Sequence, residues 1–181
     1  MVNKEILHEG KYIRVVREGT WEYVEHTSGR HVAYIVPIGE NKHGEPTAIF
    51  IEEYRIPLKR TVVGFPTGLV GDLKSLSGEE VITAAYRELE EETGYSAGRM
   101  RHLVSGPSSS GLSDETIHIY LADKLTKVSD EVGVDGEEIV VREVPLHKAE
   151  NWLAEREKME EYVIDIKAYI GLYFANRITL E

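Results

Sequence analysis

The chain has 181 residues, which predicts one domain of ordinary size, and its 21 basic against 32 acidic side chains give a net charge of −11. That charge argues against nucleic acid or an anionic membrane as the main partner. The absence of cysteine excludes disulfides, thiolate nucleophiles and Cys-ligated zinc sites. No apolar run approaches the ~18 residues of a membrane span, and residues 1–12 are unlike a signal peptide, so we expect a cytoplasmic protein.

Short strands are predicted in the first third of the chain. Residues 11–17 and 21–26 alternate between apolar and polar side chains, as half-buried strands do. Residues 31–38 and 47–52 are rich in β-branched side chains, which also favour strands. Because short turn-forming segments separate these strands, we expect the chain to begin with an antiparallel sheet.

A helix is the strongest prediction in the middle of the chain, after a short strand at 61–65. Ser77 and Glu80 have the spacing of a capping box, and an apolar stripe follows at helical spacing. Gly94 is placed to end this helix, because glycine readily takes the left-handed conformation found there. We therefore expect the helix to fill the segment between Ser77 and Gly94.

The second half of the chain predicts strands first and helices last. The strands fall at 101–106, 116–122 and 139–144, and the polar residues 124–138 indicate a loop between the last two. Two helical patterns follow Pro145, and in the second the apolar residues recur at i, i+3, i+4, i+7 and i+8. That helix is expected to pack against the rest of the domain.

Three carboxylates gather on the central helix. Glu88, Glu91 and Glu92 stand at i, i+3 and i+4, which places them on one arc at the border of the apolar stripe. Like charges at this spacing destabilise a helix, and the C-terminal end of the helix dipole adds to the cost. A hard divalent cation such as Mg²⁺ would remove the repulsion. A solvated acidic helix end, partly neutralised by Arg87, is the alternative that spacing alone leaves open.

Residues 79–95 resemble the Nudix box: a glycine, five residues, a glutamate, seven residues, then Arg-Glu-apolar-x-Glu-Glu-x-Gly-apolar. Every position from Glu79 onward matches. The opening glycine is displaced, because Leu73 stands in its place; Gly68 is the equivalent that we assign, with an insertion after it. The resemblance implies that Arg87 pairs with a glutamate of the box, for which Glu79 is the candidate. The motif residues with structural roles are then Gly68, Glu79, Arg87 and Gly94.

Further segments resemble the ADP-ribose and nucleoside diphosphate sugar pyrophosphatases of this family. They are residues 20–22, 53–57, 65–69 and 111–116. Two positions depart from that branch. Gly64 stands where many members have an acid, and Ser110 stands where ADP-ribose specialists have a proline. The resemblance therefore implies nucleoside diphosphate sugars as a class rather than ADP-ribose alone.

The resemblance implies both a fold and an activity. The fold is α/β (α+β), the Nudix fold, with a mixed β-sheet between α-helices and an N-terminal antiparallel sheet. The activity is hydrolysis of ADP-ribose and of ADP-, GDP- and UDP-hexoses to a nucleoside monophosphate and a sugar phosphate, with Mg²⁺ or Mn²⁺ as cofactor. Alternatives are a Nudix hydrolase of dinucleoside polyphosphates or nucleoside triphosphates, and a nucleotide-sugar sensor without turnover.

Roles in metal binding and catalysis follow from the same resemblance. The metal ligands are Glu88, Glu91 and Glu92, joined by the backbone carbonyl of Thr67. The general base is expected in the loop before the last sheet strand. Counting back from Pro145 gives Glu137, with Glu138 beside it, while other branches of the family favour Glu91. The candidates for the base are therefore Glu137, Glu138 and Glu91.

Substrate contacts are also implied. Arg55 is the candidate to clamp the diphosphate, since a guanidinium binds phosphate oxygens in a bidentate manner. Trp21 is the candidate to stack on the base. Ser113 and Glu115 belong to the matched segment and are taken as substrate-binding residues. The plainer alternatives are a surface arginine for Arg55 and a half-buried strand residue for Trp21.

A homodimer is expected, because the strands before the Nudix core would otherwise leave exposed edges, and the resemblance implies the same. We assign residues 1–40 to an N-terminal, dimerising part and residues 41–181 to the catalytic domain. Neither a nucleic acid nor a membrane is expected as a partner.

Overall fold

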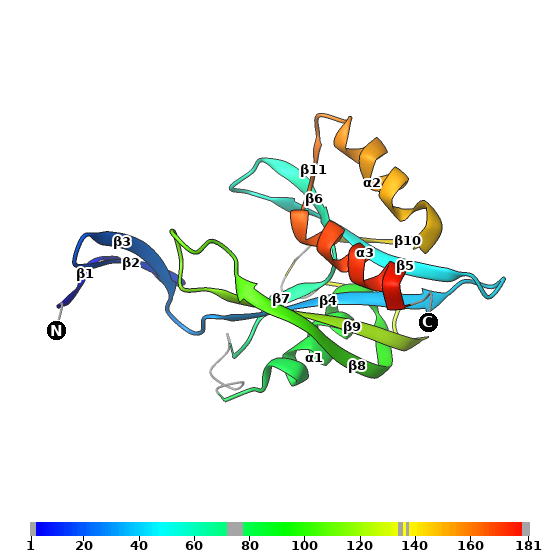
Figure 1. Cartoon of the computed structure of the whole chain (residues 1–181), viewed down its shortest axis with the longest axis horizontal. Helices are drawn as coiled ribbons and strands as arrows, with labels where there is room; N and C mark the ends of the chain where they lie inside the picture. The colour runs from blue at the N-terminus through cyan, green and yellow to red at the C-terminus, as the bar shows by residue number, and fades with distance from the viewer. Residues whose placement is uncertain (1–2, 72–77, 134–135, 137, 179–181) are drawn as a thin grey trace.

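The computed structural model describes residues 3–71, 78–133, 136 and 138–178. The N-terminal strands β1 (Lys4–Glu9), β2 (Ile13–Glu18) and β3 (Trp21–His26) form an antiparallel sheet of their own. Figure 1 shows this sheet projecting from one end of the main body. It is joined to the body where Val24 pairs with Ser113, and where His26 Nε2 lies 2.9 Å from a Glu115 carboxylate oxygen.

A mixed central sheet forms the main body, in the order β11-β6-β5-β4-β9-β8. Its strands β4 and β9 are parallel, as are β6 and β11, and the other pairs are antiparallel. Two further strands attach to it, β7 to β4 and β10 to β5. The bounds are β4 (His31–Glu40), β5 (Pro46–Arg55), β6 (Arg60–Gly64), β7 (Thr67–Leu69), β8 (Tyr95–Pro107), β9 (Thr116–Lys127), β10 (Ile139–Pro145) and β11 (Tyr162–Ile164).

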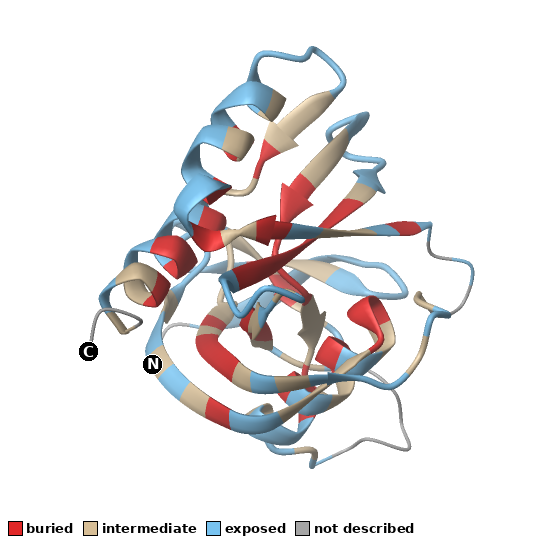
Figure 2. Cartoon of the chain, turned by 90° about the vertical axis from the view of Figure 1, so that its right-hand side faces the viewer, coloured by how far each residue is buried: buried red, intermediate tan, exposed pale blue. Residues whose placement is uncertain are grey.

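Helices cover both faces of the central sheet, so the predicted fold class is confirmed. The helix α1 (Val81–Thr93) packs on one face, and α2 (Ala149–Glu157) and α3 (Ile166–Ile178) pack on the other, after a short 3₁₀ turn at Leu146–Lys148. Two apolar cores result. Ile119 and Leu121 of β9 pack toward α3, whereas Tyr120 and Ala122 pack toward α1. Figure 2 shows the buried residues concentrated in the strands and on the inner sides of the helices.

Several predicted boundaries were wrong, because pairing between strands recruits polar residues. The strand β8 begins at Tyr95 and runs to Pro107, beyond the predicted 101–106. Its partner β9 continues to Lys127, into the segment predicted as a loop, because Tyr95 pairs with Lys127. The strand β4 lies inside the central sheet, so the separate N-terminal sheet ends at His26 and not at residue 40.

The start of α1 also differs from the prediction. The helix begins at Val81, and Glu80 is its extended N-cap without a side-chain capping bond. Ser77, the other half of the predicted capping box, lies outside the described residues. In the part of the chain that the structure describes, no helix has the length and apolar character needed to cross a membrane.

Candidate functional site

The acids of α1 lie along the border of its buried face, as their spacing predicted. Glu88 and Glu92 are buried, Glu91 is half-buried, and Glu90, between them in sequence, is exposed. Helical geometry explains this, because residues three and four apart share a face while their neighbour points away. A carboxylate wall is thereby formed next to the apolar core that Leu89 enters.

Arg87 links this wall to Glu79. Its Nε and one terminal nitrogen donate to the two Glu79 oxygens at 3.1 and 3.2 Å, and the other terminal nitrogen donates to Glu88 at 2.7 Å and to Glu91 at 2.8 Å. Burial by itself lowers the pKa of Arg87, but the hydrogen bonds and charges of these carboxylates raise that pKa well above its ordinary value. Arg87 therefore stays charged and orients the acids.

The short strand β7 closes the other side of the wall. The Thr67 N–H donates to Glu92 at 2.8 Å, and the Thr67 hydroxyl donates to the carbonyl of Ala33 at 3.0 Å. A Cβ at Gly68 would lie 2.0 Å from the Glu88 carboxyl group. Only glycine leaves room for that carboxylate, which is a physical reason to take Gly68 as the motif glycine.

The loop after β9 is attached to the end of α1. Gly94 ends the helix in the left-handed conformation with φ 69°, and a Cβ there would lie 2.1 Å from the carbonyl oxygen of Ser129. Further along the loop, the Gly133 N–H donates to the carbonyl of Glu91 at 2.8 Å. Of the predicted general bases, Glu138 is exposed and stands just before Ile139, which pairs with Glu53 of β5, while Glu137 lies outside the described residues.

A pocket of about 190 Å³ lies beside the wall. Thr67 and Arg55 both line it, and Arg55 makes an ion pair with Glu53 at 2.6 Å. Two residues that the sequence analysis missed also line it: Asp165 and Lys167, paired at 2.6 Å. They stand at the start of α3, and no local pattern marked them.

One signal for these residues did exist at Gly64, where the family resemblance implies an acid. A Cβ at Gly64 would lie 3.3 Å from the Cβ of Asp165. Asp165 therefore supplies a carboxylate next to the space that a side chain at position 64 would enter. The substitution is visible in the sequence, but its partner comes from a distant element and is placed only by the fold.

A second, larger pocket of about 510 Å³ lies at the junction with the N-terminal sheet. Trp21, Tyr23, Ser113 and Asp114 line it, and Trp21 is 61% exposed. The structure thus brings Trp21 together with Ser113, while Arg55 lines the pocket near the carboxylates. Glu115, two residues after Ser113 in the sequence, pairs with His26.

The NUDIX domain family matches residues 29–164, which include the carboxylate wall, Arg87, β7 and Arg55. The chain belongs to this family. The predicted family of Nudix pyrophosphohydrolases is thereby confirmed.

Individual relatives agree with this Nudix assignment. A methanol dehydrogenase activator from Bacillus methanolicus is 35% identical over 152 residues, which is 83% of this chain and 76% of that protein. An ADP-ribose pyrophosphatase from Bacillus subtilis (strain 168) is 38% identical over 114 residues, which is 62% of this chain and 59% of that protein. A crystal structure of an ADP compounds hydrolase has the same fold, with a TM-score of 0.74 at 22% identity, over 97% of this chain and 91% of that one.

Nudix hydrolases generally use divalent cations, and the donor set here suits one. Glu88, Glu91 and Glu92 offer hard carboxylate oxygens, and the cradle at Gly68 holds one of these groups against β7. Among the described residues, no three Asp, Glu or His side chains are already arranged as a metal centre. Arg87 binds one oxygen of Glu88 and one of Glu91, so it occupies part of their donor capacity.

Proposed function

We propose that this chain hydrolyses the pyrophosphate bond of nucleoside diphosphate sugars, with Mg²⁺ or Mn²⁺ as cofactor. The substrates are ADP-ribose and ADP-, GDP- and UDP-hexoses, and the products are a nucleoside monophosphate and a sugar phosphate. The observation that carries the proposal is the carboxylate wall, braced by Arg87 and by the Thr67 N–H beside the pocket of Arg55. Similarity to an ADP-ribose pyrophosphatase supports the substrate class.

Each part of the site has a role in this reaction. Glu88, Glu91 and Glu92 hold the cation, which neutralises diphosphate charge and activates water when bound. Arg55 donates two N–H groups to phosphate oxygens, leaving its present partner Glu53. In the chemical step, a water oxygen bonds to one phosphorus, the bridging P–O bond breaks, and a carboxylate accepts the proton of the water.

The identity of that carboxylate belongs to the proposal. Glu137 and Glu138 follow the loop that the Gly133–Glu91 hydrogen bond holds at the end of α1, which supports a base from this segment. Glu91 is the other candidate, and its carboxylate is already engaged by Arg87. Loss of activity in only one of the Glu137→Gln and Glu138→Gln variants identifies that residue as the base, whereas full activity in both favours Glu91.

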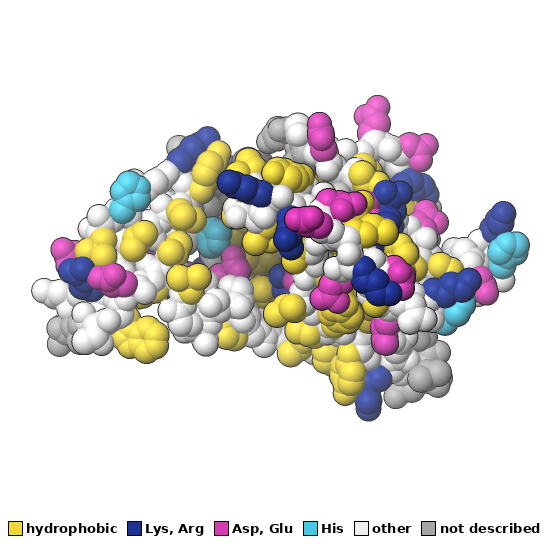
Figure 3. Space-filling view, turned by 90° about the horizontal axis from the view of Figure 1, so that it is seen from above, with side chains coloured by type: hydrophobic (Ala, Val, Ile, Leu, Met, Phe, Trp, Pro, Cys, Tyr) yellow, Lys and Arg dark blue, Asp and Glu magenta, His cyan; other side chains and the backbone are white. Residues whose placement is uncertain are grey.

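A homodimer is part of the proposal. Trp21 and Arg55 line separate pockets of one chain, which supports a dimer in which a second copy brings its Trp21 to the first copy's Arg55. The N-terminal sheet also exposes Ile6, Tyr12 and Ile13, and Figure 3 shows hydrophobic side chains over this end of the molecule. A monomeric mass in sedimentation at micromolar protein would refute this part.

Substrate range follows from the same contacts. Stacking on Trp21 tolerates every base, and Arg55 with the cation contacts only the diphosphate. We therefore expect kcat/KM for ADP-ribose and several nucleotide hexoses to agree within ~10²-fold. The Trp21→Ala variant should raise KM for all of them together. A kcat/KM that is ~10⁴-fold higher for one substrate than for the others would require a dedicated sugar or base contact instead.

The decisive test measures phosphate release from a panel of nucleotide sugars, dinucleoside polyphosphates and nucleoside triphosphates, with added phosphatase and with or without EDTA. A sensor without turnover releases no phosphate in any arm. The Glu92→Gln variant should lower kcat by at least ~10²-fold, since a metal ligand is lost. The exposed neighbour Glu90 provides the control, and Glu90→Gln should keep full activity.

A second candidate function comes from the similarity to the methanol dehydrogenase activator. In that case the chain raises the turnover of a dehydrogenase, and nucleotide-sugar hydrolysis is secondary. The test adds wild-type protein or Glu92→Gln to a purified methanol dehydrogenase and follows alcohol oxidation. Strong activation by wild type, with little hydrolysis of the substrate panel, would favour this candidate, and the Glu92→Gln arm tells whether activation needs the carboxylate wall.

A further inference from the structure

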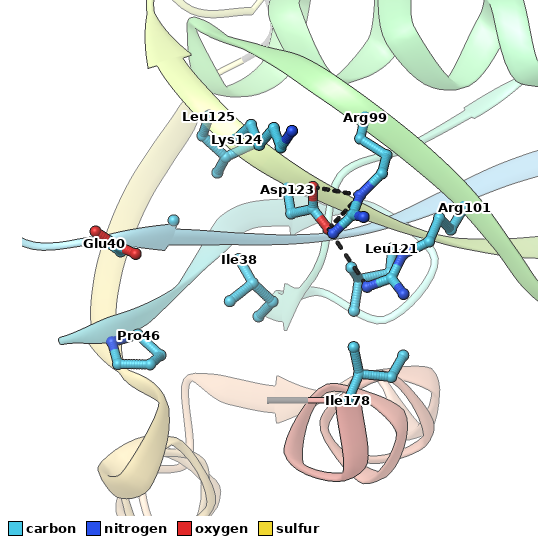
Figure 4. A pocket seen from close by; sticks show the side chains of 11 residues that line it. Ile38, Glu40, Pro46, Arg99, Arg101, Leu121, Asp123, Lys124, Leu125 and Ile178 are labelled. Atoms are coloured by element: carbon cyan, nitrogen blue, oxygen red, sulfur yellow. Dashed lines mark hydrogen bonds and ion pairs between the residues drawn. The ribbon is translucent and has the colours of Figure 1, made fainter. Parts of the chain in front are cut away.

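A cavity of about 490 Å³ lies on the opposite side of the central sheet from the carboxylate wall. Met100 and Ala122 pack toward α1, so the adjacent Arg99, Arg101 and Asp123 point to the other face. Ile178, at the end of α3, lies across from them. Figure 4 shows both guanidinium groups turned toward Asp123, with Ile178 on the facing side.

One end of this cavity is basic and partly unsatisfied. The Nε of Arg99 donates to Asp123 at 2.8 Å, and a terminal nitrogen of Arg101 lies 3.3 Å from the same carboxylate. The Nε of Arg101 is buried and has no hydrogen-bond partner in the part of the chain that the structure describes. A buried donor without a partner is costly.

The third cation, Lys124, is held in a strained backbone conformation. Its φ is 56°, in the left-handed region that side chains other than glycine rarely adopt. Gly98 faces it across the strands, where a Cβ would lie 3.0 Å from the Cβ of Lys124. Because of this irregularity, Asp123, Lys124 and Leu125 all line the cavity, although strict alternation would turn Lys124 away. Strain of this kind is characteristic of ligand sites.

Charge and shape indicate the class of ligand. Arg99 and Arg101 pair with Asp123, and Lys124 also lines the cavity, so three cations stand against this one carboxylate and attract a dianion. Glu40 lies at the opposite end (Figure 4). A phosphate monoester carries about −1.5 to −2 charges at pH 7 and offers several acceptor oxygens to guanidinium groups. The remaining walls are apolar, and they are formed by Ile38, Pro46, Leu121, Leu125 and Ile178.

We propose that this cavity binds a small organic phosphate monoester. The phosphate lies at Arg101 and Lys124, and the less polar body of the ligand lies against the apolar walls. The size of the cavity is within the range of small-molecule sites. The site lies on the other face of the sheet from Glu88 and Glu92 and does not depend on the activity proposed above.

The experiment titrates ¹⁵N-labelled protein with AMP in EDTA, and follows the Nε–H signal of Arg101 and the amide of Ile178. AMP should shift both signals, whereas adenosine, which lacks the phosphate, should not. The Arg101→Met and Lys124→Gly variants should weaken AMP binding by at least ~10-fold. Lys158→Met, which removes an exposed cation just after α2, is the matched control and should bind as wild type does.

Stability distinguishes lost binding from lost folding. Glycine relieves the left-handed conformation at position 124, so Lys124→Gly should keep or raise the Tm while it loses AMP. The proposal is overturned if AMP shifts only amides of the carboxylate wall, such as that of Thr67. Equal AMP affinity in wild type and both variants would overturn it as well. Inorganic phosphate that binds as tightly as AMP would refute the role of the apolar walls.

Discussion

The two faces of the central sheet carry opposite charge, although the same strands build both. On the α1 face, Glu79, Glu88 and Glu91 are gathered around Arg87. On the α3 face, Arg99 and Arg101 are gathered around Asp123. Each face thus places one charge of the opposite sign among like charges. The α1 face needs the space left by the missing side chain at Gly68, and the α3 face includes the left-handed backbone of Lys124.

A substitution at Gly68 is expected to disrupt the carboxylate wall on the α1 face more than any other single change. In Gly68→Ala the new Cβ would meet the Glu88 carboxyl group at 2.0 Å, so the carboxylate must move. We expect kcat to fall by at least ~10²-fold, because the proposed metal ligands lose their arrangement. Gly106→Ala is the control, since a Cβ there meets nothing within 4 Å. Unchanged nucleotide-sugar hydrolysis in Gly68→Ala would contradict the assigned role of Glu88.

The Arg87→Gln variant measures how much the clustered acids of the α1 face depend on Arg87 for stability. The Arg87→Gln variant leaves Glu79, whose side chain is 4% exposed, without its ion pair. We expect unfolding free energy to fall by about 2 kcal/mol, less than for a fully buried pair because Arg87 keeps contact with water. Chemical denaturation with and without Mg²⁺ measures this loss. A cation that neutralises the same acids should restore part of the stability, and no effect of Mg²⁺ would count against the metal site.

Lys167 lines the same pocket as Arg55 and adds positive charge there, so it tests the proposed substrate-binding role of this pocket. The Lys167→Met variant should raise KM for nucleotide sugars by about 10-fold and change kcat less, since uniform binding is lost. Steady-state kinetics with ADP-ribose measures both constants. Lys158→Met is again the control, and a similar rise in KM there would point to a general effect of charge.

The smallest expected effect concerns pH and His118, whose ring lies on the α1 side of β9, next to His31. Burial, followed by the charges of His31 and His102, lowers the pKa of His118. Below the ordinary histidine pKa of about 6.5, the unfolded chain therefore binds more protons, and stability should rise as the pH increases through that range. Thermal unfolding between pH 5 and 8 should show a shallower dependence in His118→Asn, and an identical slope would refute the assignment.

Much of the fold was predictable because it depends on local patterns. Strand alternation, the apolar stripe of α1 and the glycine at position 94 each act over a few residues, so the strands, the main helix and its end were predicted. The Nudix box is equally local, so it identifies the family without any information on tertiary contacts. The boundaries of β8 and β9 were missed because polar residues such as Lys127 become strand only through their partners.

The sequence by itself determined that Glu88, Glu91 and Glu92 share one side of a helix, because helical spacing requires it. Only the tertiary structure decided that Gly68 makes room for Glu88, and that Asp165 lies beside the space at Gly64. It also decided that Trp21 and Arg55 line different pockets of one chain. These contacts join segments far apart in the sequence, and their distances depend on how sheets and helices pack, which no short-range pattern encodes.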